Sequence, residues 1–401
     1  MARYGLPETV EFCKICVLSN QKVTPSVVTS DDKESKKNTL EFKNGTCSAC
    51  RLNIEKQHVI DWEDRSYQLM KICSQYRSNN GGWDCIVPGS GGKDSVFQSI
   101  VLREKYKMNP LTVTWAPHMY TTYGWKNFDN WLKKGGFSNF LFTPDGLKHA
   151  QLTRIAFENL LHPFQPFILG QRNYVMHMAK NLGIKLIFFG ESPAEYGGFS
   201  GEEDEFKMNE MYYVDDNRDK MLISGLSLKD LKDEHNISEE DLKYYLPLTS
   251  GQVENADLLP LWLGYFEKFH PQNNYYFAKK HVDFTPNDQR TEGTFSRYNS
   301  LDDKIDGFHY WTSHIKFGVG RTSHEASQEI RNGDLEREEA VALVKKYDGE
   351  FPLRYAEDFG RYIGLSVKQI KDHADLFRPE HLWLKVNGEW ELKHQVKNHN
   401  Y

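Results

Sequence analysis

The sequence lacks the long apolar runs of a membrane protein and the clustered basic residues of a nucleic-acid-binding protein. No apolar run in its 401 residues approaches the roughly 18 residues that a membrane-spanning helix needs. The N-terminal stretch MARYGLPETVEF has no basic start followed by an apolar core, as a secretory signal would. Lysine and arginine are dispersed and the formal net charge is -6, which disfavours a nucleic-acid partner. We therefore expect a soluble, cytoplasmic protein.

Cysteine is also scarce, and four of the six cysteines form two CxxC pairs, Cys13/Cys16 and Cys47/Cys50. In a cytosolic chain such pairs are more typical of a tetrahedral Zn²⁺ site than of disulfides. Four thiolates leave no open coordination position, which favours a structural ion, and redox-active dithiols are the alternative. The polar spacer between the pairs, residues 29–38, predicts an extended hairpin loop.

From residue 83 the pattern alternates between short apolar runs and helical periodicity, which predicts an α/β fold with a parallel sheet. The expected strands are 83–88, 111–115, 137–142 and 184–189, and the expected helices are 93–104, 123–134, 146–161 and 170–182. Ligands of open α/β sheets bind at the carboxyl ends of strands. Gly89-Ser90, Thr114-Trp115 and Gly190-Glu191 should therefore line one crevice.

We divide the chain into five segments. These are a zinc-binding module (1–55), a helical linker (56–82), the α/β core (83–220), a substrate-binding and core-completing region (221–355) and a helical C-terminal tail (356–401).

The run Pro88-Gly-Ser-Gly-Gly-Lys-Asp-Ser95 joins the first strand to the first helix of the core. At such a junction, unpaired backbone N–H groups and the positive end of the helix dipole favour a phosphate. A Walker A loop would need glycine where Val87 stands and Ser or Thr where Asp94 stands, so that motif is excluded. The dinucleotide fingerprint also fails at Asp94. The run S-G-G-K-D-S resembles the PP-loop of the ATP pyrophosphatases, which cleave ATP between its α and β phosphates.

Two later stretches are rich in polar and aromatic residues. Glu191 to Glu205 predicts an active-site loop, in which Glu191 and Tyr196 are the best functional candidates, and Glu202 to Glu205 favour a solvated connector. Residues 290–311 suit a sugar or nucleotide pocket, with exposed loop charges as the alternative. Cations near a cleaving phosphate would stabilise departing pyrophosphate, and the candidates for that role are Lys316 and Arg321, with surface ion pairing as the alternative.

These motifs occur together with LTVTWAP, FFGESPAEYGG, EGTFSRY, SLDDKIDGFHYW, KFGVGRTSHEASQEIR and YDGEFP. Over roughly residues 10–355, the combination resembles the N-acetyl sugar amidotransferases of lipopolysaccharide O-antigen and flagellin glycan biosynthesis. Those enzymes turn an acetamido group of an activated sugar into an acetamidino group. The resemblance implies a Rossmann-like sheet of the adenine nucleotide α-hydrolase (PP-loop) type, with an N-terminal zinc ribbon and a helical C-terminal region.

The resemblance also implies roles for individual residues. ATP would be held by Ser90, Gly91, Gly92, Lys93, Asp94, Ser95, Thr114, Trp115, Gly190 and Glu191. Mg²⁺ would be placed with the help of Asp94. The catalytic candidates are Lys93, Asp94, Lys316 and Arg321. The substrate candidates are Tyr196, Arg290, Glu292, Arg297 and Tyr298. Structural Zn²⁺ would be bound by Cys13, Cys16, Cys47 and Cys50.

Ammonia is needed for an amidine, and the chain offers no glutaminase motif around Cys73 or Cys85. The resemblance implies a separate glutaminase subunit like that of histidine biosynthesis, with a possible cyclase-like companion. The substrate would be a nucleotide-activated diacetamido sugar, either a uronic acid or a nonulosonic acid such as pseudaminic or legionaminic acid. The alternatives are a PP-loop enzyme that thiolates tRNA, which would need a sulfur-carrying cysteine and a basic surface, and a non-catalytic nucleotide sensor.

Overall fold

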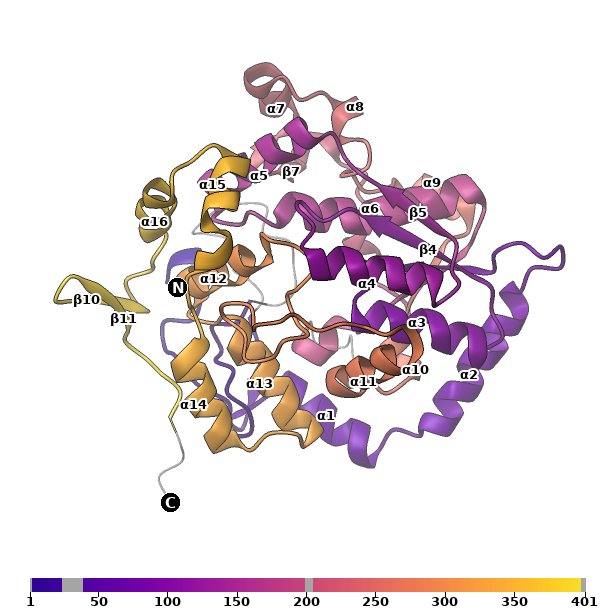
Figure 1. Cartoon of the computed structure of the whole chain (residues 1–401), viewed down its shortest axis with the longest axis horizontal. Coiled ribbons are helices and arrows are strands. Elements are labelled where there is room, and N and C mark those ends of the chain that lie inside the picture. Colours follow the sequence, from indigo (N-terminus) through magenta and orange to yellow (C-terminus); the bar gives the residue numbers. More distant parts are fainter. Residues whose placement is uncertain (1, 24–38, 199–204, 398–401) are drawn as a thin grey trace.

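The computed structural model describes residues 2–23, 39–198 and 205–397, and Figure 1 shows its arrangement. The predicted hairpin loop at 29–38 and most of Glu202 to Glu205 lie outside these ranges. At the centre is a five-stranded sheet, and the register of all its strand pairs is parallel. In spatial order its strands are β5 (Asn139–Phe142), β4 (Pro110–Trp115), β3 (Cys85–Pro88), β6 (Leu186–Phe189) and β9 (Leu259–Trp262). The predicted α/β class with a parallel sheet is confirmed.

The strand order places a topological switch point between β3 and β6. The chain runs outward from β3 through β4 to β5 and then returns to lay β6 on the other side of β3. Loops that leave two such neighbouring strands diverge and open a crevice at their carboxyl ends. The loops in question begin at Gly89 and Gly190, so the fold itself brings together two of the three predicted strand ends.

Burial on both faces explains the composition of the central strands. Every residue of β4 is buried, as are Cys85, Ile86 and Val87 of β3. Strands covered on both faces need no alternation of polar and apolar residues. The helices of this region are α3 (Lys93–Glu104), α4 (Thr122–Lys133), α5 (Gly146–Leu160) and α6 (Gln165–Leu182).

The fifth strand, β9, was not among the predicted strands. Pro260 lies inside β9, which is an edge strand of the sheet, the position where a proline is tolerated. On the outer side of β9, the Met208 N–H donates to the Pro260 carbonyl and the Trp262 N–H donates to the Phe206 carbonyl.

The N-terminal module that carries the four cysteines packs against the C-terminal half. The module holds the short strands β1 (Phe42–Lys43) and β2 (Thr46–Cys47) and the helix α1 (Ser48–His58), followed by α2 (Trp62–Tyr76). The C-terminal half contains α12 (Asp306–Phe317), α13 (Arg321–Asn332) and α14 (Arg337–Tyr347), and α13 lies beside α1 (Figure 1). The Asn53 amide donates to the Arg331 carbonyl at 2.8 Å, which ties α1 to α13.

Seven further α-helices and two hairpins complete the list of larger elements in the described ranges. They are α7 (Leu228–His235), α8 (Glu239–Leu242), α9 (Ser250–Ala256), α10 (Leu263–Phe266), α11 (Pro271–Val282), α15 (Ala356–Ile363), α16 (Val367–Asp375), the hairpin β7–β8 (Leu222–Ile223, Leu226–Ser227) and the hairpin β10–β11 (Trp383–Val386, Glu389–Leu392). The C-terminal segment is thus helical only up to α16 and then forms β10–β11, which the expectation of a helical tail did not include. Its turn, Asn387-Gly388, has positive φ at both residues, as a two-residue hairpin turn requires.

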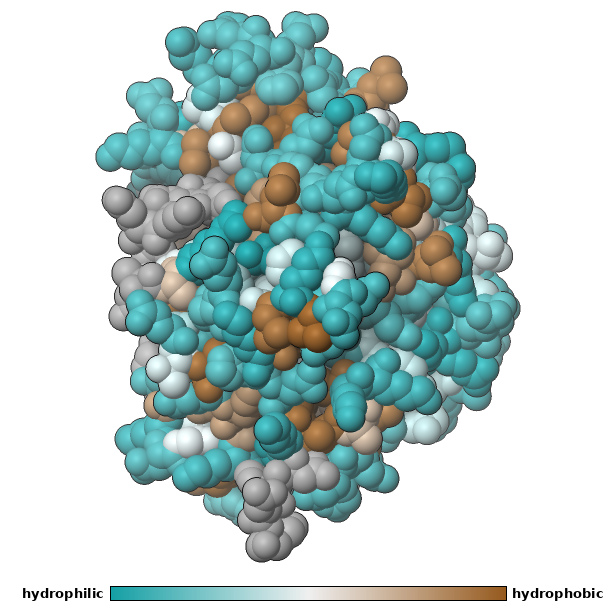
Figure 2. Space-filling view, turned by 90° about the vertical axis from the view of Figure 1, so that its left-hand side faces the viewer, coloured by the Kyte–Doolittle hydropathy of each residue, from teal (hydrophilic) through white to brown (hydrophobic). Residues whose placement is uncertain are grey.

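Hydrophobic side chains are scattered in small groups among polar ones on the face shown in Figure 2. That face carries no broad apolar patch of the kind that marks an obligate interface.

Candidate active site

The loop between β3 and α3 is shaped by glycines whose positions cannot accept a side chain. Gly91 has φ of 83°, and a Cβ there would lie 2.5 Å from the Cα of Phe128. A Cβ on Gly89 would lie 2.3 Å from the Cβ of Ser95. Both glycines are therefore explained by the fold alone.

Gly92 is different, because no neighbouring atom of the described residues requires a glycine there. It is the N-cap of α3 with an ordinary φ of -66°, and the nearest atom to an added Cβ is the Ser90 Oγ at 3.8 Å. The missing side chain leaves space directly at the N-terminus of a twelve-residue helix. The residues present therefore fit a phosphate group, which needs close approach to backbone N–H groups at such a point.

Two charged side chains follow Gly92 in the first turn of α3. The Lys93 Nζ lies 2.7 Å from the Asp94 Oδ2, and the Asn274 amide donates to the Asp94 Oδ1 at 2.9 Å. Ser90 and Ser95 are held by the protein, since the Ser90 Oγ donates to the Asp302 Oδ2 and the Ser95 Oγ donates to the Gly92 carbonyl. The loop is thus fixed from both sides before any ligand binds.

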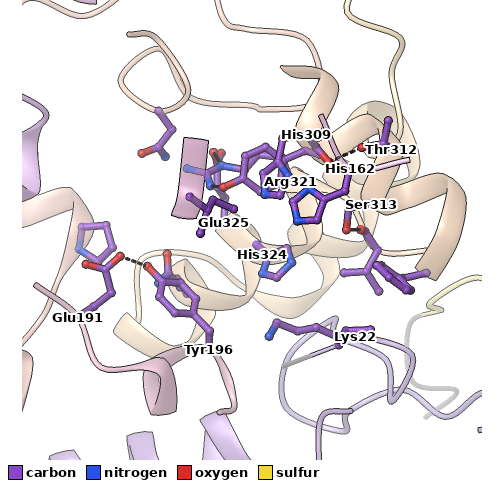
Figure 3. A pocket seen from close by; sticks show the side chains of 18 of the residues that line it. Lys22, His162, Glu191, Tyr196, His309, Thr312, Ser313, Arg321, His324 and Glu325 are labelled. Carbon is purple, nitrogen blue, oxygen red and sulfur yellow. Dashed lines mark hydrogen bonds and ion pairs between the residues drawn. The ribbon is translucent and has the colours of Figure 1, made fainter. Parts of the chain in front are cut away.

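Lys93 and Asp94 line a cavity of about 400 Å³, and Figure 3 shows other side chains that line it. The cavity lies beside the switch point and extends to residues of the zinc-binding module, the α5–α6 turn, α6, α12 and α13. Besides Lys93 and Asp94, its charged, histidine and tyrosine residues are Lys22, His162, Arg172, Glu191, Tyr196, His309, Tyr310, Lys316, Arg321, His324 and Glu325.

Glu191 and Tyr196 form a buried pair on the β6 side of the cavity. The Tyr196 hydroxyl donates to the Glu191 Oε1 at 2.8 Å (Figure 3). Burial raises the pKa of Glu191, and the nearby Asp94 raises it further. Asp94 and Glu191 both line this cavity, and two carboxyl groups that face one cavity are a donor set that fits a divalent cation such as Mg²⁺.

Arg321 begins α13 and is held in the cavity wall by two partners. Its Nε donates to the Glu325 Oε1 at 2.8 Å, and its Nη1 bonds the Tyr310 hydroxyl. Burial opposes its charge, but Tyr310 and Glu325 hold the pKa of Arg321 above its usual range. The other predicted cation, Lys316, also lines the cavity, and its Nζ donates to the Leu160 carbonyl at 2.7 Å.

Histidines line the same cavity, although their spacing in the sequence gave no signal. His309 stacks on His162 with ring centroids 5.1 Å apart. Burial is the main cause that lowers the pKa of His309 to about 3, and the positive charge of Arg321 lowers it further. His324 of α13 contacts Tyr310 of α12, with ring centroids 6.4 Å apart. The residues meet because α12, α13 and the α5–α6 turn converge, which no local pattern reveals.

The remaining predicted site residues lie outside this cavity. Thr114 is buried and accepts a hydrogen bond from Asn139, and Trp115 packs among aromatic rings such as Tyr245 and Phe142. Gly190 lies at a small neighbouring hollow, where a Cβ would meet the Gln98 amide at 2.4 Å.

The candidates between residues 290 and 298 have protein partners. Arg290 forms a two-pronged pair with Glu350, at 2.5 and 2.7 Å. Glu292 accepts from the Arg354 N–H, and Arg297 donates to the Asp288 carbonyl. The Tyr298 hydroxyl donates to Glu329.

Four cysteines form a candidate metal site, and none of them lines the cavity. The sulfur atoms of Cys13, Cys16, Cys47 and Cys50 all lie within 4.8 Å of one another, and all four residues are buried. Four converging thiols fit one tetrahedral ion such as Zn²⁺, as the CxxC spacing predicts. Leu18, Leu40 and Val319 pack around the cluster, so the module has a small core built on the ligands.

Within the described ranges, no helix combines the length and the apolar character that crossing a bilayer requires.

Comparison with known proteins connects the C-terminal part of the chain with lipopolysaccharide biosynthesis. Residues 292–397 match the family model described as LPS biosynthesis protein WbpG-like, C-terminal domain. The match supports the coarse prediction of a role in lipopolysaccharide biosynthesis. It includes α12 and α13, which carry Tyr310, Arg321 and Glu325, and it continues well beyond residue 355, where the resemblance was expected to end. No curated protein matches the chain.

Proposed function

We propose that this protein is an ATP-dependent amidotransferase that converts an acetamido group of a nucleotide-activated sugar into an acetamidino group, in lipopolysaccharide O-antigen or flagellin glycan biosynthesis. The observation that carries the proposal is the shared cavity. A phosphate-accepting helix N-terminus with Lys93 and Asp94 opens into the same space as Arg321, on a segment that matches a lipopolysaccharide biosynthesis family.

The reaction follows from the chemistry of an amide, whose oxygen is a poor leaving group. The acetamido oxygen would attack the α-phosphorus of ATP, and the bond to the β-phosphate would break, with release of pyrophosphate. Ammonia would then attack the same carbon, and AMP would leave with the oxygen. The net change replaces one oxygen by NH, and the ammonia would come from a partner glutaminase, with a cyclase-like subunit as a possible companion.

The chain's own residues would supply binding and charge neutralisation. The open backbone at Gly92 and the ammonium of Lys93 would receive phosphate oxygens. The carboxyl groups of Asp94 and Glu191 would hold Mg²⁺ near them, and Mg²⁺ would neutralise charge on the departing pyrophosphate. Arg321 would stabilise negative charge from the opposite wall, since preorganised cations act strongly in a buried cavity.

The buried state of the other cysteines argues against the alternative of tRNA thiolation. Cys73 and Cys85 are both 0% exposed, and burial raises the pKa of the Cys73 thiol to about 12 and that of Cys85 well above its usual value. Neither is an accessible thiolate that could carry sulfur.

The test is an assay of purified protein with Mg-ATP, ammonium chloride and a panel of nucleotide-activated diacetamido sugars. AMP release, with a product in which one oxygen has become NH by mass spectrometry, is the expected result. Lys93→Met should lose activity, and Lys133→Met, on an exposed face of α4, is the matched control. ATP left intact across the panel by a folded, metal-loaded protein would refute the proposal.

A further inference from the structure

A lysine of the zinc-binding module reaches into the cavity. Lys22 is 3% exposed and lines the cavity wall, six positions after Cys16. Its backbone is fixed, because its N–H donates to the Ser19 carbonyl and its carbonyl accepts from the Leu40 N–H. Figure 3 shows the side chain extending from its loop towards His324 and the middle of the cavity. The module that the cysteines organise therefore contributes a cation to the site.

This ammonium has no anionic partner among the described residues. Its Nζ makes no hydrogen bond or ion pair within ranges 2–23, 39–198 and 205–397. The charged groups that act on it are Arg331, which repels it, and Cys47 and Cys16, which attract it. Burying a cation without a carboxylate is costly, and an anion that enters the cavity would offset that cost.

Arg172 repeats this arrangement on another wall of the same cavity. It extends from α6, its Nη1 donates to the Tyr212 carbonyl at 3.3 Å, and its guanidinium lies 5.1 Å from the Tyr212 ring. Within the described part of the chain no carboxylate pairs with it, and burial lowers its pKa to about 10. The acidic residues that line the cavity, Asp94, Glu191 and Glu325, are engaged by Lys93, Tyr196 and Arg321 respectively.

We propose that Lys22 and Arg172 form an anion-binding subsite for the second substrate, separate from the phosphate-binding end at Gly92 and Lys93. The subsite would take either the diphosphate or a sugar carboxylate of the nucleotide-activated sugar, so this inference rests on the proposed function. The cavity then has two cationic ends, one for ATP and one for the sugar, and the acetamido group would lie between them.

A simpler role for Lys22 is to balance the thiolates of a metal-loaded cysteine cluster. Arg331 already serves that purpose, since Cys16, Cys50 and Cys47 all act to raise its pKa. The two roles differ in their consequences. Loss of a balancing charge would weaken metal binding, whereas loss of a ligand-binding charge would leave the metal in place.

The subsite is tested by calorimetric binding of UDP, UDP-glucose and UDP-glucuronate to the full-length, zinc-loaded protein saturated with α,β-methylene-ATP. Saturation keeps the phosphate-binding loop occupied. Wild-type protein should bind at least one probe, and Lys22→Met and Arg172→Met should each weaken that binding by roughly tenfold or more, because each removes a charged hydrogen-bond donor. Lys22→Arg should retain part of the affinity.

The matched controls are Lys43→Met, an exposed lysine of the same module, and Arg154→Met, which pairs with Glu158 on the surface of α5. Equal weakening of all three probes identifies the diphosphate as the bound anion. Weakening confined to UDP-glucuronate identifies the carboxylate.

Three results would overturn the proposal. They are no binding of any probe to the wild type, unchanged affinity in both variants, and loss of zinc in Lys22→Met. Because binding is measured without turnover, failure of the amidotransferase assay would not be mistaken for failure of the subsite.

Discussion

Glu329 is a buried carboxyl group whose charge is set by its surroundings. It lies on α13 at 8% exposure and accepts a hydrogen bond from the Tyr298 hydroxyl at 3.0 Å. Burial raises its pKa from 4.5 to about 7, and the nearby Asp334 adds to the effect. The folded state therefore binds more protons than the unfolded state between these two values, so this group makes stability fall as pH rises from about 4.5 to about 7.

Glu329→Gln should remove that penalty while keeping an oxygen for Tyr298. We expect the free energy of unfolding to rise by on the order of 1 kcal/mol at pH 8 and to change little near pH 4.5, as measured by urea unfolding. The exposed Glu338→Gln on α14 is the control. Equal destabilisation by Glu329→Gln at both pH values would show that the carboxylate is the preferred form in the fold.

Arg321 and Glu325 form an ion pair in the cavity wall, which could contribute to the stability of the fold, to catalysis, or to both. Its partner Glu325 is 4% exposed, so Arg321→Met would leave a buried carboxylate unpaired and should cost about 3 kcal/mol of stability. The double variant Arg321→Met/Glu325→Gln should recover most of that loss. AMP formation should stay reduced by roughly a hundredfold in both variants if Arg321 stabilises the departing pyrophosphate. Recovery of activity together with stability in the double variant would assign Arg321 a structural role only.

At the scale of elements, the loop between β3 and α3 contains glycines required by the fold and one glycine, Gly92, that is available to a ligand. Gly92→Ala adds a methyl group to open space at an ordinary φ, so the melting temperature should stay unchanged. The affinity for ATP should fall by roughly tenfold, because the methyl group would occupy the phosphate position.

Gly91→Ala should show the opposite pattern. Its φ of 83° and the Phe128 backbone 2.5 Å from the added Cβ should cost more than about 1 kcal/mol of stability. Thermal unfolding with and without ATP measures both effects, and Gly146→Ala, which meets nothing within 4 Å, is the neutral control. Normal ATP affinity in the Gly92→Ala protein would show that the phosphate does not bind at Gly92.

The elements of the core could be predicted because each carries a local signal. The helix predicted at 93–104 is α3 (Lys93–Glu104), and the strand predicted at 111–115 is β4 (Pro110–Trp115). A short buried apolar run bounded by turn residues predicts a strand. By contrast, β9 contains Pro260 and forms a strand because it pairs with β6. The Asn387-Gly388 pair is typical of a two-residue hairpin turn, and the prediction of a helical tail did not take it into account.

The cavity could be predicted only in part, for a related reason. Lys93 and Asp94 begin the helix after β3, and Glu191 and Tyr196 lie in the segment after β6, so the fold class brings them towards the same edge of the sheet. Lys22, His162, Arg172 and His324 come from four separate segments that meet through tertiary packing alone. The dense charges of residues 290–298, which suggested a pocket, instead pair with Glu350, Arg354, Asp288 and Glu329.

At the scale of the whole molecule, the module that carries the four cysteines contacts two segments that line the cavity. The module contacts the segment that carries Glu191 and Tyr196, since the Lys56 Nζ lies 2.5 Å from the Glu195 Oε1 and both side chains are largely buried. It also contacts α13, where the Val17 N–H donates to the Ser327 Oγ at 3.4 Å. A change in the module should therefore reach both walls of the cavity.

We expect about one zinc ion per chain, and its removal should lower both stability and activity. Cys50→Ser should lose the metal, lower the melting temperature and weaken AMP formation, because Lys22, Lys56 and Val17 all depend on the folded module. Cys73→Ser is the matched control, since Cys73 is equally buried but lies in a different core cluster and should keep its zinc and its activity. Elemental analysis, thermal unfolding and the AMP assay on both variants make the comparison. Full activity in a zinc-free Cys50→Ser protein would mean that the cavity holds its shape without the module, and the coupling argued from Glu195 and Ser327 would be wrong.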